Sequence, residues 1–212
     1  MGRNYIFEIK GDLMKGRIKT FVVGCALAVQ LMTPAVGHAD QGASAPVVNH
    51  DIGKWANLLN HFEGALHSSG PVSTGVAAWK TAIARMKSLP AKQQIEEVND
   101  LLNAVPYVDD QQQFGFNGYW NATPERFLSE GGDCKDYALA KYASLRALGF
   151  SPEQLRITVV IDQARNIPHA ILIVNNTYVL DNQSQDVVST SDIGRYQKLF
   201  SLNSRGWRRE VG

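Results

Sequence analysis

The sequence predicts an α+β fold in which several helices come first and a small antiparallel sheet follows. Two patterns along the chain indicate this order. Between about residues 51 and 105, apolar residues recur at intervals of three and four, whereas after residue 155 β-branched and apolar residues gather in short runs between turn residues. The chain has 212 residues, 44% of them hydrophobic and 19% charged, so it is long and apolar enough to form one core.

The first 39 residues have the three parts of a secretory signal peptide. Basic residues precede a mostly apolar stretch from Thr20 to Val36, and small residues at 37 and 39 mark a cleavage site. Met14 is an alternative start, because it opens a shorter and more regular signal. A transmembrane anchor is the competing interpretation, but polar residues and a proline interrupt the apolar stretch. We therefore expect export, with cleavage near Asp40.

Cleavage would change the charge and the cysteine content of the chain. The full sequence has a formal net charge of +1, which predicts no nucleic-acid partner, and the mature chain would be slightly acidic. Cleavage also removes Cys25, one of two cysteines. A disulfide within the mature chain is then excluded, and Cys134 is either a buried, inert thiol or a thiol kept for its chemistry.

Residues 51–212 are expected to form a single domain, preceded by a flexible lead over residues 40–50. Helical spacing predicts helices over residues 51–68, 77–89 and 91–105, separated by Ser69-Gly70-Pro71 and by Pro90. Residues 106–124, rich in Asp, Gln, Gly and Asn, are expected to form a loop. We expect the large aromatic residues of the first two helices to pack in the core: Trp55, Phe62 and Trp79.

The second half of the domain begins with a short helix over residues 124–128, capped by Thr123, and a turn at Gly131-Gly132-Asp133. A longer helix is expected from Cys134 to about Leu148, with one apolar face. Strands follow over residues 155–161, 169–174 and 177–181, and Asn175-Asn176 would form a tight turn between the last two.

Cys134 opens a helix directly after Gly-Gly-Asp. Backbone N–H groups and the positive end of the helix dipole lie at such a position, and they lower the pKa of a thiol. The thiolate is the reactive form, so the position favours a nucleophile. The same N–H groups are suited to stabilise an oxyanion.

His169 and Asp181 follow Cys134 in the order nucleophile, base and orienting carboxylate. In a hairpin closed by two residues, His169 would lie opposite Asn182 and one residue away from Asp181. Neighbouring residues of a strand point to opposite faces, so a bulge or a longer turn would be needed to bring the pair together. Either residue alone is more often structural than catalytic, but with Cys134 the three together favour a catalytic site.

Three segments then resemble a known family: GGDCKDYALAKYASLRALGF (131–150), PHAILIV (168–174) and YVLDNQ (178–183) are similar to the bacterial transglutaminase-like cysteine proteinases. The stretch GYWNATPERFLSEGG (118–132) resembles that family's Trp-x-x-Pro-x-Glu stretch, with one residue more between Trp120 and Pro124. The resemblance covers about residues 95–200. It implies a transglutaminase/papain-like fold with the nucleophile at a helix N-terminus packed on a small antiparallel sheet.

The resemblance also implies roles for individual residues. Cys134 would be the nucleophile, His169 the base and Asp181 the orienting carboxylate, with Asp186 as the competitor for the third role; Trp120 is expected to bind substrate. The family's calcium site uses acidic residues that flank the cysteine, here Asp133 and Asp136. Lys135 stands where relatives often have Glu, and it argues against calcium because it removes a ligand and adds a positive charge. The chemistry itself needs no cofactor.

The LapG-type members of this family are periplasmic proteases that cut large surface adhesins and release biofilm cells, and an inner-membrane cyclic-di-GMP receptor sequesters them. The resemblance thus implies a periplasmic thiol endopeptidase with an adhesin substrate and such a receptor as partner. Two alternatives stay open on the same fold: acyl transfer to an amine, as in true transglutaminases, and a non-enzymatic binding module, suggested by Lys135 and the altered spacing at Trp120.

Overall fold

The computed structural model of the chain describes residues 46–115, 118 and 120–210, with side chains from residue 52 onward. The expected signal peptide and its cleavage site lie outside these residues. The first helix begins at Pro46, so residues 46–50, which we assigned to the flexible lead, are helical. Within the part of the chain that is described, no helix is both long and apolar enough to cross a membrane.

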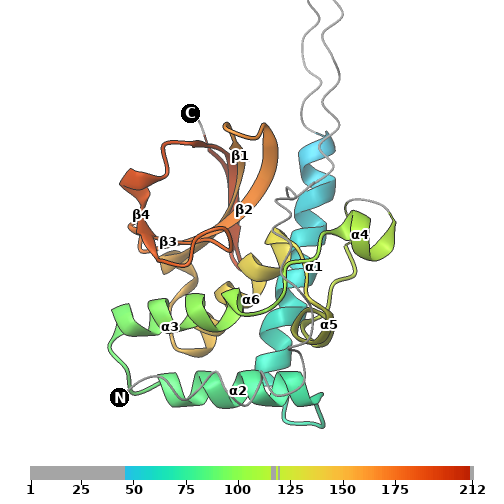
Figure 1. Cartoon of the computed structure of the whole chain (residues 1–212), viewed down its shortest axis with the longest axis vertical. Helices are drawn as coiled ribbons and strands as arrows, with labels where there is room; N and C mark the ends of the chain where they lie inside the picture. The colour runs from blue at the N-terminus through green and yellow to red at the C-terminus, as the bar shows by residue number, and fades with distance from the viewer. Residues whose placement is uncertain (1–45, 116–117, 119, 211–212) are drawn as a thin grey trace, which may run out of the picture.

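The helices of the described chain precede most of the sheet in sequence, as expected of an α+β fold (Figure 1). Helix α6 lies at the centre, because it packs against α1, α3 and strands β1 and β2. The helices are α1 (Pro46–His67), α2 (Thr74–Met86), α3 (Ala91–Asn103), α4 (Asp110–Phe114), α5 (Pro124–Glu130) and α6 (Cys134–Ala147).

The sheet is antiparallel throughout, with the strand order β4-β3-β2-β1-β5-β6. Figure 1 shows it curving strongly, with the helices gathered on one side. Its strands are β1 (Leu155–Asp162), β2 (Ile167–Val174), β3 (Tyr178–Leu180), β4 (Val188–Ser189), β5 (Tyr196–Asn203) and β6 (Gly206–Arg209).

The main core lies between the helices and one face of the sheet, and it contains Trp55, Phe62 and Trp79 as expected. Phe62 packs edge-on against Trp79, with ring centroids 6.5 Å apart, and the indole N–H of Trp79 donates to the hydroxyl of Ser144 in α6 at 2.9 Å. A smaller cluster that includes Val160, Ile171 and Ile193 is separate from the main core. The aromatic residues of α1 and α2 therefore fix the position of the central helix.

Helix α6 departs from the expectation of one apolar face. Every residue from Cys134 to Leu145 is buried, including Lys135 and Lys141, because neighbours surround the helix. A buried lysine must find charged or polar partners inside the protein. The partners of Lys135 and Lys141 lie around the functional site.

Candidate active site

The turn before α6 places Cys134 at the first position of the helix. Gly131 has φ of +90°, and a Cβ there would lie 2.4 Å from the carbonyl oxygen of Pro106, so glycine is required. Asp133 caps the helix: its Oδ1 accepts from the backbone N–H of Lys135 at 3.0 Å, while Asp136 Oδ2 accepts from the N–H of Asp133 at 3.0 Å. This reciprocal capping box fixes the backbone on both sides of Cys134.

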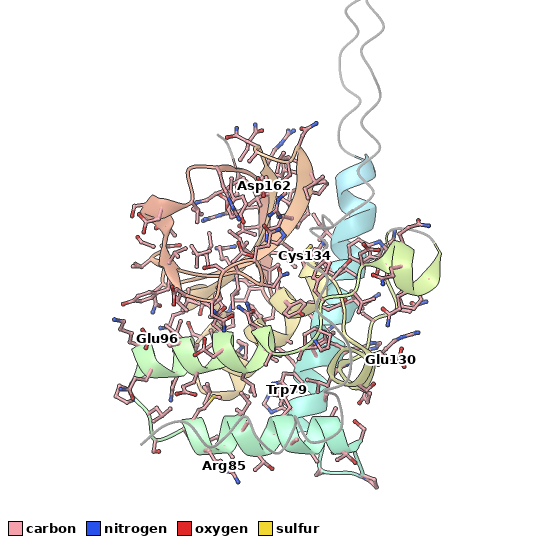
Figure 2. All side chains as sticks on the ribbon, in the orientation of Figure 1. Trp79, Arg85, Glu96, Glu130, Cys134 and Asp162 are labelled. Atoms are coloured by element: carbon pink, nitrogen blue, oxygen red, sulfur yellow. The ribbon has the colours of Figure 1, made fainter. Side chains whose placement is uncertain are left out.

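Cys134 is fully buried, and Figure 2 shows it in the interior where the helices meet the sheet. In the full-length chain it is a disulfide cysteine. The sequence holds one other cysteine, Cys25, which lies outside the described residues. The expectation of a mature chain without a disulfide therefore depends on removal of the N-terminal segment.

His169 is fully buried in β2, the strand on which α6 packs. Its Nε2 lies 2.8 Å from Asp181 Oδ1. An ionised carboxylate only accepts hydrogen bonds, so Nε2 carries the proton and Nδ1 carries the lone pair. The side-chain amide of Gln183 donates to Nδ1 at 3.3 Å, which agrees with this tautomer. A histidine in this state is prepared to take a proton at Nδ1.

Asp181 follows β3, and its buried carboxylate accepts two hydrogen bonds besides the contact with His169. Burial by itself would raise the pKa of Asp181, but hydrogen bonds and charge from His169, the hydroxyl of Tyr196 and the backbone N–H of Gln183 outweigh it and lower the pKa to about 2. The Tyr196 hydroxyl donates to Oδ2 at 2.6 Å, and the Gln183 N–H donates to Oδ1 at 2.9 Å. Asp181 is therefore held as an anion beside His169.

The hairpin between β2 and β3 explains why His169 and Asp181 meet. Its register pairs Leu172 with Leu180 and Val174 with Tyr178, so the connection has three residues rather than the expected two. Asn175 and Asn176 both have positive φ, and the Thr177 N–H closes the turn on the carbonyl of Val174. Continued beyond β3, this register places Asp181 on the same face as His169.

Two asparagines of α3 hold the loop that carries Asp181. Asn103 Nδ2 donates to the carbonyl oxygens of Asp181 and Ser184 at 3.0 and 2.8 Å, and Asn99 Nδ2 donates to the carbonyl oxygen of Gln185 at 2.9 Å. Lys141 of α6 donates to Asn99 Oδ1 at 2.8 Å. The helix that begins with Cys134 and the loop that carries Asp181 are thus joined through α3.

Lys141 is deeply buried, and its ammonium donates to Asn99 Oδ1 at 2.8 Å and lies 5.9 Å from the ring centroid of Tyr137. Burial lowers the pKa of Lys141 from 10.5 to about 7, although the negative charges of Asp181 and Asp100 oppose this shift. Sequence reasoning missed this residue because a lysine in a helix is usually exposed, although its spacing of seven residues places it on the same helix face as Cys134.

A second buried lysine lies among the acidic residues that flank Cys134. Lys135 Nζ is 2.9 Å from Asp133 Oδ1, 3.1 Å from both oxygens of Asp110 and 3.5 Å from Asp136 Oδ2. Burial raises the pKa of Asp133 to about 7, the ammonium of Lys135 opposes this, and Asp136 and Asp110 add to it. Asp110 belongs to α4, a helix that the sequence did not predict, so its part in this cluster was missed.

Trp120 contacts residues of α1, and not the groups around His169 or Lys135, in the interactions that the structure describes. Its ring meets that of Trp55 in α1 edge-on, with centroids 5.5 Å apart, and Lys54 Nζ lies 5.3 Å from its centroid. The residue is half-buried. Its role in substrate binding stays a prediction.

Comparison with known protein families identifies the family of this chain. The family model described as bacterial transglutaminase-like cysteine proteinase matches residues 77–208, more than half of the chain. The chain belongs to the bacterial transglutaminase-like cysteine proteinases. A comparison with curated proteins found no match.

Solved structures of a family member agree. Legionella pneumophila LapG in its calcium-bound form is 27% identical, with a TM-score of 0.58, over 72% of this chain and 90% of that one. Its EGTA-treated form is 28% identical, with a TM-score of 0.60, over 73% and 86% of the two chains. A third LapG structure is 28% identical, with a TM-score of 0.59, over 71% and 85%. The predicted α+β transglutaminase-like fold and the cysteine peptidase class are therefore confirmed.

The calcium-bound relative raises the question of whether this chain's residues fit calcium. Calcium takes six to eight oxygen ligands at about 2.3–2.6 Å. Within the described residues, no group of three or more His, Cys, Asp or Glu side chains is arranged to hold a metal ion. The oxygens of Asp110, Asp133 and Asp136 instead face the ammonium of Lys135. The cluster of this family member does not fit calcium.

Proposed function

We propose that the chain is a periplasmic endopeptidase that uses Cys134 as nucleophile, His169 as base and Asp181 as the orienting carboxylate to cleave a large surface adhesin and so regulate biofilm attachment. The observation that carries the proposal is the buried contact of His169 Nε2 with Asp181 Oδ1 at 2.8 Å, on the strand against which the helix of Cys134 packs.

The proposed reaction proceeds in two steps of acyl transfer. The Cys134 thiol gives its proton to His169 Nδ1, and the thiolate attacks the carbonyl carbon of the scissile peptide bond. The N-terminus of α6 stabilises the negative charge of the oxyanion. The C–N bond then breaks, and the amine leaves with the proton from His169, so that a thioester remains on Cys134. Water, deprotonated by His169, hydrolyses the thioester and regenerates the thiol.

Asp181 supports both steps without itself taking up a proton. Its depressed pKa keeps the carboxylate ionised, so it stabilises the imidazolium that forms after proton transfer. Gln183 donates to His169 Nδ1 in the resting site, and this hydrogen bond must be exchanged for the contact with the thiol. The amide of Gln183 is thereby placed beside the reacting atoms.

The deciding experiment uses the purified mature chain, beginning at Asp40, under reducing conditions. The test substrate is the N-terminal region of a large secreted adhesin from the same organism. We expect cleavage at one site, its loss in Cys134→Ala with an unchanged melting temperature, and retention in the surface control Asp186→Asn. Cleavage by Cys134→Ala at the wild-type rate would refute the assignment of the nucleophile.

Two further measurements separate the alternatives on this fold. Mass spectrometry of the products distinguishes hydrolysis, which adds water, from acyl transfer, which joins the acyl group to an added amine. Alkylation of Cys134 by iodoacetamide across pH distinguishes an activated thiol from the thiol of a binding module, which would react only near pH 8 to 9. A cyclic-di-GMP receptor of the inner membrane is proposed as the sequestering partner, and binding of its periplasmic domain to the mature chain tests this.

A further inference from the structure

The ammonium of Lys135 is enclosed by three carboxylates from different parts of the chain. Asp110 comes from α4, Asp133 from the cap of α6 and Asp136 from its first turn, and all four side chains are buried. A lysine ammonium has three N–H donors, and each carboxylate lies within 3.5 Å of Nζ. The positive charge therefore stands at the centre of an acidic cluster that would otherwise be uncompensated.

Oxygens of all three carboxylates already accept hydrogen bonds from Lys135 Nζ. Asp133 Oδ1 and Asp136 Oδ2 accept from Nζ and also from backbone N–H groups of the capping box at 3.0 Å. Both oxygens of Asp110 also accept from Nζ, whereas Asp136 Oδ1 has no hydrogen-bond partner. The adjoining cavity, lined by Asp110, Gly131 and Asp136 among others, measures about 10 Å³, which is room for about one water molecule.

We infer that the side chain of Lys135 is a built-in cation that replaces a divalent metal ion in this family member, so that the chain folds and positions Cys134 without calcium. The ammonium joins α4 to the capping box that fixes the start of α6. It can do so at all calcium concentrations, because the cation is covalently part of the residue that follows the nucleophile.

The inference is tested on the wild-type mature chain by thermal unfolding in EGTA and in millimolar CaCl₂, together with calorimetric titration of CaCl₂. We expect the same melting temperature in both buffers and no binding heat. A higher melting temperature in CaCl₂, or saturable binding at micromolar calcium, would overturn the inference. Neither readout requires a substrate, so the result stands whether or not the proposed endopeptidase activity is found.

A pair of variants tests the role of the charge itself. Lys135→Met keeps the length of the side chain but leaves the buried carboxylates without a cation, so we expect the melting temperature to fall by roughly 10 °C. Lys92→Met is the control, because the Lys92 side chain is 69% exposed and forms an ion pair with Glu96 on the surface of α3. Equal melting temperatures for the two variants would contradict a compensating role for Lys135.

Discussion

His169 Nε2 lies 2.8 Å from Asp181 Oδ1, and the hydroxyl of Tyr196 approaches the other oxygen of the same carboxylate at 2.6 Å. One carboxylate thus links β2, the loop after β3 and β5. Its contacts fix the plane of the imidazole and the nitrogen that carries the proton.

Replacing Asp181 with Asn should lower kcat/KM on the proposed adhesin substrate by about 10³-fold, because an amide neither fixes the tautomer of His169 nor stabilises its charged form. Asp186→Asn is the matched control, since Asp186 is exposed and lies five residues further along the same loop. Steady-state kinetics of both variants measure the effect. A comparable loss in Asp186→Asn would transfer the third catalytic role to Asp186.

Asn103→Ala should reduce kcat by roughly 10- to 100-fold while changing the melting temperature little. The reason is that the loop that carries Asp181 loses two hydrogen bonds from α3. The control is Asn60→Ala, on the exposed side of α1. If Asn103→Ala lowered the melting temperature but left kcat unchanged, the residue would serve stability and not positioning.

Lys141 should make the stability of the fold depend on pH. Its pKa is about 7 in the folded chain and 10.5 in its ordinary state, so between these values the unfolded chain binds a proton that the folded chain lacks. The free energy of unfolding should then rise with pH by up to about 1.4 kcal/mol per unit in this range. Urea unfolding at pH 7, 8 and 9 measures it, and Lys141→Met should lose this part of the slope. Parallel pH curves for the two proteins would show that Lys141 does not titrate as described.

Gly131→Ala should destabilise the fold by more than about 1 kcal/mol, because its φ is +90° and the new methyl group would meet the carbonyl oxygen of Pro106 at 2.4 Å. The matched control, Gly53→Ala, should have the opposite sign. Gly53 lies in α1 with open space around it, and alanine favours the helix by up to about 1 kcal/mol. Urea denaturation of both variants gives the two free energies.

The spacing of apolar residues predicted α1, α2, α3 and α6, and short runs of β-branched and apolar residues between turn residues predicted strands β1 to β3. Helix α4 was missed because five residues are too few to show one. Strand β5 was missed because its sequence, YQKLFSLN, places polar residues among apolar ones without alternation. The hairpin register was wrong by one residue, since Asn175-Asn176 reads as a two-residue turn although Thr177 also belongs to the connection.

The site shows the same limit at the level of side chains. The order of Cys134, His169 and Asp181 indicates the class of chemistry, and the contact of His169 with Asp181 agrees with it. The sequence places Lys135 beside two aspartates but cannot show that its side chain turns inward between them. Nor can it show that Asp110, 25 residues upstream, completes the cluster. Such contacts between distant residues depend on tertiary packing.

The Tyr196 hydroxyl that closes on Asp181 belongs to β5, which pairs with β1 at the centre of the sheet. The set of hydrogen bonds around Asp181 is therefore incomplete until this late strand has joined the sheet. If Asp181 has the proposed role, we expect peptidase activity to appear only after the C-terminal strands have folded.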